Sequence, residues 1–110
     1  MEIKQHSIIT NVEKAKEKAK KLKGEIAGIY QTTSILVGKV EEVKLEKLWS
    51  MGILFCRIRL KNVKKFDLEG NLISQTEEEL IYVNKPEFIF SLKELEKANQ
   101  KVFKSFISLL

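Results

Sequence analysis

The side chains able to perform catalysis are few and stand far apart in this sequence. There is one histidine, His6, one cysteine, Cys56, and one aspartate, Asp67. Nucleophilic catalysis needs a nucleophile, a base and an orienting acid within mutual reach, and no local signature joins these three residues. Gly38-Lys39 is followed by Val40, whereas a phosphate-binding loop has Ser or Thr after its lysine. We therefore expect no catalytic residue, no cofactor and no enzymatic activity.

Metal-binding residues are not expected either. One His and one Cys cannot build a His/Cys zinc cluster within a single chain. The densest acidic run consists of the three glutamates at 77–79, and in a strand these alternate between the two faces. Cys56 lies in an apolar, strand-like run and is interpreted as a small buried hydrophobic residue.

The acidic run has a basic counterpart in a predicted β-hairpin. The best strand candidate is 52–66, and Leu68-Glu69-Gly70 has the composition of a three-residue loop ending in a left-handed glycine, flanked by Asp67 and Asn71. This loop predicts a register in which charges face opposite charges and apolar side chains face each other. The hairpin would then neutralise its own charge. The predicted pairs are Arg59–Glu79, Lys61–Glu77, Ile58–Leu80 and Cys56–Tyr82.

The charge left over is expected on a lysine-rich helix near the amino terminus. The chain has a net charge of +5, and residues 12–23 hold six lysines against two glutamates, which gives 6 − 2 = +4. Such a helix could contact phosphates with salt-dependent, sequence-independent affinity, or its lysines could serve only solubility on a solvated face. The candidate polyanion-binding residues are Lys14, Lys16, Lys18, Lys20, Lys21 and Lys23.

The carboxyl-terminal segment is unusually apolar, and part of it should be exposed in a monomer. Exposed apolar patches favour contacts with partners, so we expect a homo-oligomer or a protein partner. The aromatic residues are interpreted as core between a sheet and the last helix, with a cavity for an apolar ligand there as the alternative. The candidate interaction surface comprises Phe103, Phe106, Ile107, Leu109 and Leu110.

The elements that must position these residues have recognisable ends. Thr10 and Glu13 have capping-box spacing and Gly24 suits a helix end, which predicts a helix at about 11–23. Ser91 and Glu94 form a second capping box before an apolar stripe, which predicts one amphipathic helix at about 91–108. The segment between them is strand-like. Residues 39–49 fit a strand better than a short helix, and 3–9 could form a weak strand.

These patterns predict a single α+β domain over 1–110. Its expected fold is an antiparallel β-meander of four to five strands with both helices packed on the sheet. The 44% hydrophobic and 32% charged fractions are those of a globular domain. No apolar stretch approaches the roughly 20 residues of a membrane span, so a cytoplasmic location without membrane contact is expected. Enrichment in Lys and Glu is a weak thermophilic signal.

The function expected from the sequence is that of a small, non-enzymatic binding protein acting through protein–protein contacts or self-association. Two alternatives stay open. The first is a nucleic-acid-associated module that uses the lysine-rich helix 12–23. The second is a binder of an apolar small ligand between the sheet and the carboxyl-terminal helix.

Overall fold

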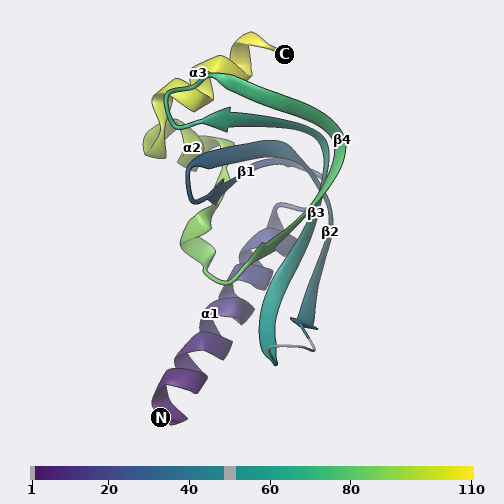
Figure 1. The fold of residues 1–110 in the computed structure, drawn as a ribbon, viewed down its shortest axis with the longest axis vertical. Helices are drawn as coiled ribbons and strands as arrows, with labels where there is room; N and C mark the ends of the chain where they lie inside the picture. The colour runs from purple at the N-terminus through teal and green to yellow at the C-terminus, as the bar shows by residue number, and fades with distance from the viewer. Residues whose placement is uncertain (1, 49–51) are drawn as a thin grey trace.

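A five-stranded antiparallel sheet with helices on both faces forms the fold (Figure 1). The computed structural model describes residues 2–48 and 52–110, and side chains within 10–47 and 52–110. Trp49 therefore lies outside the described residues. The sheet order is β4-β3-β2-β1-β5, so the predicted meander is confirmed and β5 adds a short strand beside β1. The elements are α1 Glu2–Lys21, β1 Ile26–Gln31, β2 Ser34–Leu48, β3 Ile53–Asp67, β4 Leu72–Val83, the 3₁₀ turn η1 Pro86–Phe88, β5 Ile89–Ser91, α2 Leu92–Ala98 and α3 Gln100–Ser108.

The two faces of the sheet carry two separate hydrophobic cores. On one face, α1 buries Val12, Ala15 and Ala19 against β1–β4. On the other face, which we call the outer face, α2 and α3 bury a cluster against one end of β1–β3. Because β1 and the start of β2 are covered on both faces there, residues 26–30 and 35–37 are nearly continuous apolar runs instead of alternating ones. The outer cluster comprises Ile35, Val37, Phe66, Leu95, Val102 and Phe106.

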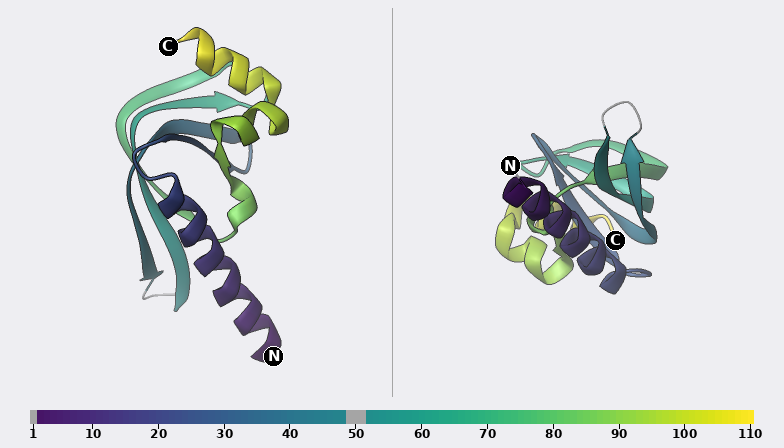
Figure 2. Two further views of the ribbon diagram at one scale, coloured as in Figure 1. Left: turned by 180° about the vertical axis from the view of Figure 1, so that it is seen from behind. Right: turned by 90° about the horizontal axis from the view of Figure 1, so that it is seen from below.

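Strands β2, β3 and β4 curl around the carboxyl-terminal half of α1, while the amino-terminal end of α1 runs past the sheet (Figures 1 and 2). Bulges account for the curl, because an extra residue in one strand bends it and increases its twist. One shift in register lies between Val37 and Lys39, opposite Asn62, which has a positive φ of 52°. Gly38 lies at this shift in register.

Replacing Gly38 by alanine is expected to destabilise the fold by about 1–3 kcal/mol through overpacking. A Cβ there would lie 2.9 Å from the backbone oxygen of Lys61 and 3.3 Å from Leu60 Cβ. Gly28→Ala on the adjacent strand is the control, since its Cβ would meet only methyl groups at 3.4–3.5 Å. Urea unfolding should separate the two variants, and equal costs would contradict the tight approach at Gly38.

The helices differ from the sequence prediction at two places. The amino-terminal helix begins at Glu2, so Thr10 lies inside α1 and the weak strand at 3–9 was wrong. The predicted single helix at 91–108 is two helices, because Asn99 has extended backbone angles of −153° and 92°. Its side chain accepts a hydrogen bond from Val102 N at 3.0 Å, and an Asn that caps in this way competes with a continuous helix. The capping box of Ser91 and Glu94 is confirmed.

The β3–β4 hairpin has the predicted loop but not the predicted register. Asp67 N donates to Asn71 O at 2.9 Å, and Gly70 has a φ of 88°. Phe66 pairs with Leu72 as the loop requires, but Lys65 then pairs with Ser74, leaving Ile73 as a bulge. All four predicted cross-strand pairs beyond this point were therefore wrong by one residue. The observed pairs are Arg59–Leu80, Lys61–Glu78, Ile58–Ile81 and Cys56–Val83.

The carboxylate of Asp67 holds the hairpin loop together. Its Oδ1 accepts from the backbone N of Glu69 and of Asn71, both at 2.9 Å, and its Oδ2 accepts from Asn71 Nδ2 at 3.0 Å. The hydrogen bonds from the Asn71 backbone and side chain lower the pKa of Asp67. A pKa lower in the folded state than in the unfolded chain means that the ionised carboxylate stabilises the fold.

We expect this stabilisation to be present above pH ~4, near the ordinary aspartate pKa, and to be lost as pH falls through the lowered pKa. An NMR titration of the Asp67 carboxyl carbon should give a midpoint below ~3.9. In addition, the free-energy difference between the wild type and Asp67→Asn should narrow as pH falls below about 4. A difference independent of pH would contradict this role for the charge.

Candidate functional site

The exposed edge of the sheet at β4 is the strongest candidate for a functional site. β4 pairs with β3 alone, so its other edge is free (Figure 1). Of its twelve residues only Ile81 and Val83 are buried. Large apolar side chains along it are exposed: Ile73 by 54%, Leu80 by 50% and Tyr82 by 40%. A long strand edge that combines free backbone groups with exposed apolar side chains is a template for pairing with another chain.

The bulge at Ile73 determines which β4 side chains are available. In the register predicted from the loop, Leu80 and Tyr82 would face Ile58 and Cys56 in the core. The one-residue shift places them on the outer face instead, and a shift of one residue exchanges the two faces for the whole strand. Tyr82 packs edge-on against Phe55 of β3, with ring centroids 6.3 Å apart and planes at 85°. Leu80, Tyr82 and Phe55 thus form an apolar group on the outer face.

A chain of ion pairs lies beside this apolar group and connects three strands. Arg57 reaches Glu46 at 3.3 Å and Glu42 at 3.0 Å, both on β2. Arg59 reaches Glu42 at 3.1 Å and Glu78 of β4 at 3.6 Å. The two arginines of the hairpin are thus paired mainly with glutamates of β2, and the predicted Arg59–Glu79 and Lys61–Glu77 pairs are not formed. Burial acts to raise the pKa of Glu42, but the Arg59 and Arg57 guanidinium groups outweigh it and lower that pKa.

The other two glutamates of the acidic run have no such partner. Within the described side chains, neither Glu77 nor Glu79 lies within 4.0 Å of a basic nitrogen. Glu79 accepts a hydrogen bond from Thr76 Oγ1 at 3.3 Å. The middle of the free edge therefore carries negative charge that the protein itself does not neutralise.

The predicted polyanion-binding lysines occupy both flanks of α1. Their spacing places Lys14, Lys18 and Lys21 along one side of the buried stripe, and Lys16, Lys20 and Lys23 along the other. Lys18 is engaged, because its Nζ donates to Glu94 Oε2 at 2.9 Å and to the backbone oxygen of Pro86 at 3.3 Å. In the described part of the chain no ion pair is formed by Lys14, Lys16, Lys20, Lys21 or Lys23.

The five residues of the predicted carboxyl-terminal surface do not form one surface. Phe106 is buried in the outer cluster, and Phe103 packs against that cluster. Ile107, Leu109 and Leu110 remain exposed at the end of α3. Between the sheet and the last helices, where the sequence predicted a core and left an apolar-ligand cavity as the alternative, the side chains of the outer cluster are each at most 3% exposed.

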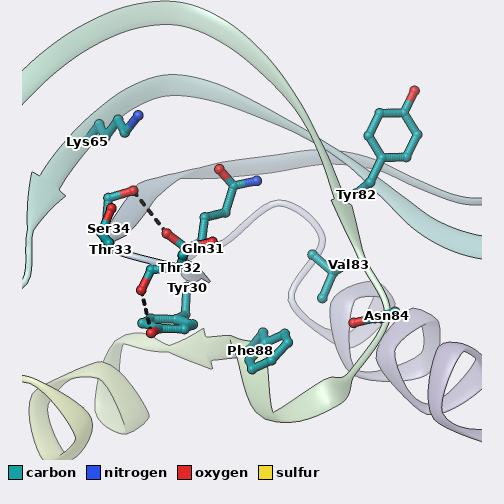
Figure 3. A pocket seen from close by; sticks show the side chains of 10 residues that line it. All are labelled: Tyr30, Gln31, Thr32, Thr33, Ser34, Lys65, Tyr82, Val83, Asn84 and Phe88. Atoms are coloured by element: carbon teal, nitrogen blue, oxygen red, sulfur yellow. Dashed lines mark hydrogen bonds between the residues drawn. The ribbon is translucent and has the colours of Figure 1, made fainter.

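An open hollow of about 530 Å³ lies between the β1–β2 turn, the end of β4 and Phe88 (Figure 3). Its polar groups are partly used within the turn: Tyr30 Oη donates to Thr32 O at 2.5 Å and Ser34 Oγ donates to Gln31 O at 3.3 Å. Among its lining residues Lys65 is the single charged one, and the Tyr82 ring points away from the turn. Most of its lining residues are polar, whereas small-ligand sites are lined mainly by apolar and aromatic side chains.

Cys56 is fully buried, and this burial raises the pKa of its thiol to about 11. No three His, Cys, Asp or Glu side chains come together as metal ligands in the described part of the chain. None of its described helices has the length and apolarity needed to cross a membrane.

The fold and site define an α+β protein whose curved antiparallel sheet has a long, exposed edge at β4. Comparison with known proteins gives it no relatives, since no protein-family model and no curated protein matches the chain.

Proposed function

We propose that this protein is a non-enzymatic binding protein that takes up an extended segment of another polypeptide along the free edge of β4. The observation that carries the proposal is the exposure of this long edge together with Leu80 and Tyr82 beside it. A peptide that adds a strand to a sheet gains affinity from backbone hydrogen bonds and specificity from alternate side chains.

The edge offers both kinds of contact. In an antiparallel sheet, successive residues direct their N–H and C=O groups alternately to either side. About half of the β4 backbone groups therefore point away from β3 and are available to a new strand. On the outer face, alternate side chains of that strand would cover Leu80 and the Tyr82 ring. Tyrosine is well suited to this role, because it contributes a large apolar surface and a polar tip.

A random peptide library displayed on phage and selected against the whole protein tests this proposal. Selected peptides should protect the β4 backbone amides from hydrogen exchange and leave those of α1 unchanged. The double substitution Leu80→Ser/Tyr82→Ser should weaken their binding by about tenfold or more, since each side chain buries an area worth about 1 kcal/mol or more.

Ile107→Ser/Leu109→Ser is the matched control, because it removes two exposed apolar side chains from the end of α3. This control should bind the selected peptides as the wild type does. Peptides that protect α3 and lose affinity in the α3 variant would move the site to the carboxyl-terminal surface and overturn the proposal.

A second candidate function is binding of a polyanion such as a nucleic acid by α1. It is favoured by the exposure of Lys14, Lys20, Lys21 and Lys23 without carboxylate partners among the described side chains. Gel shifts with DNA and RNA at about 50 and 200 mM salt should show binding that falls by orders of magnitude as salt rises. Absence of binding at the lower salt concentration would eliminate this candidate.

A further inference from the structure

We infer that the segment accepted by β4 is basic and alternating, and that it comes from a different protein and not from a second copy of this chain. The inference rests on the proposed function and concerns the identity of the added strand. β4 contains three glutamates and no lysine or arginine, so its own formal charge is −3. Glu78 is shared with Arg59, while Glu77 and Glu79 have no basic partner within the described side chains.

Pairing of β4 with itself is disfavoured by the position of these glutamates. If two antiparallel copies of Leu72–Val83 overlap fully, Leu72 lies opposite Val83 and Glu77 lies opposite Glu78, twice over. A slip of one residue in either direction places Glu77 opposite Glu77 or Glu78 opposite Glu78. Like charges directly opposite each other destabilise a strand pair. Charged residues on an edge strand are also a known protection against edge-to-edge association.

A strand with basic residues at alternate positions would meet favourable groups on both faces. Side chains of β4 alternate between faces, so Glu77 and Glu79 lie on one face while Leu80 and Tyr82 lie on the other. An added strand would therefore place lysine or arginine beside the two glutamates and apolar side chains beside Leu80 and Tyr82. The partner chemistry is an extended segment in which basic and apolar residues alternate.

Two synthetic ten-residue peptides test the inference: one alternates lysine and valine, and the other alternates glutamate and valine. We expect the lysine peptide to bind roughly tenfold more tightly, from two cross-strand charge pairs. The protein has a net charge of +5, so unspecific attraction would favour the glutamate peptide. A preference for the lysine peptide, with β4 amides protected from exchange, would therefore report local complementarity. The double substitution Glu77→Lys/Glu79→Lys should reverse the preference.

The outcomes separate this inference from the proposed function. If both peptides protect β4 with equal affinity, or the glutamate peptide binds better, the inference fails while the proposed function stands. If neither peptide protects β4 and no peptide from the library does so, the proposed function fails. Sedimentation of the wild type should show no dimer formed through β4, and a dimer whose β4 amides are protected would overturn the choice of a foreign strand. The triple substitution to glutamine at 77–79 should increase self-association.

Discussion

Replacement of Phe66 by alanine is expected to lower the free energy of unfolding by about 3–5 kcal/mol, the cost of deleting a buried phenyl group and leaving a cavity. Phe66 is fully buried in the outer cluster, whose other members come from β2, α2 and α3. This cluster attaches both carboxyl-terminal helices to the sheet. Since domains of this size are stable by about 5–15 kcal/mol, the variant should retain only part of its stability. Urea unfolding followed by circular dichroism measures the effect.

Phe103→Ala is the matched control for this prediction. It removes the same side chain from the same cluster, but from a position that is only half-buried. Its expected cost is about 1–3 kcal/mol, the transfer contribution alone, because a partly exposed position leaves no closed cavity. If the two substitutions cost the same free energy of unfolding, full burial of Phe66 would stabilise the fold no more than partial burial of Phe103. That result would contradict the packing described above.

Features that depend on neighbouring residues could be predicted from the sequence. The capping box at Ser91 forms because Glu94 lies three residues away, and both of its hydrogen bonds are made within one helical turn. The loop at Gly70 forms because only a few residue types accept a φ of 88°, and Asp67 is placed to bind the loop amides. In both places, the residues that form these hydrogen bonds lie within a few positions of one another in the sequence. The helix break at Asn99 is another feature that depends on neighbouring residues. The asparagine itself was the sequence signal that could have predicted it.

The register of the hairpin could not be predicted in this way. The loop specifies the first pair, Phe66 with Leu72, and this pair is as expected. The bulge at Ile73 then shifts the later pairs by one residue, so that Arg59 lies opposite Leu80 and not opposite Glu79. A contact between residues so far apart in the chain leaves no mark in the local composition. Of the charges that supported the predicted register, Arg59 pairs with Glu42 of β2 instead, while Glu77 and Glu79 have no basic partner among the described side chains.

The candidate site was missed for the same reason. Leu80 and Tyr82 were interpreted as core residues, and only the one-residue shift exposes them on the outer face. The free edge at β4 follows from the sheet order, because the chain after β4 returns to β1 at the opposite edge and adds β5 there. That placement follows from the path of the chain after Pro86, and it could not be derived from the sequence of β4. The sequence did show the acidic run at 77–79, but two of its glutamates were interpreted as partners of Arg59 and Lys61. The observed register changes that interpretation.

The hairpin loop and α3 are joined through Gly70, and this junction is the second place where one substitution should have a large effect. Ser105 Oγ donates a hydrogen bond to Gly70 O at 2.6 Å, and Asn99 Nδ2 donates to Leu68 O at 3.0 Å. A Cβ on Gly70 would lie 2.7 Å from the backbone oxygen of Lys101 and 3.0 Å from Ser105 Oγ. The serine side chain could rotate away, but the Lys101 carbonyl belongs to the backbone of α3 and could move only with the helix.

Gly70→Ala is therefore expected to cost roughly 2–5 kcal/mol, since the ~1–2 kcal/mol penalty for a side chain at positive φ adds to ~1–3 kcal/mol of overpacking. Gly24→Ala isolates the first contribution, because Gly24 has a φ of 84° and no atom within 4 Å of its would-be Cβ. Urea unfolding of the two variants should differ by the overpacking cost, and faster hydrogen exchange in α3 should accompany Gly70→Ala alone. If both variants lost the same free energy of unfolding and hydrogen exchange in α3 did not change, the loop would not be packed on α3. The start of β4, which precedes the proposed binding edge, would then be held in place by the hairpin alone.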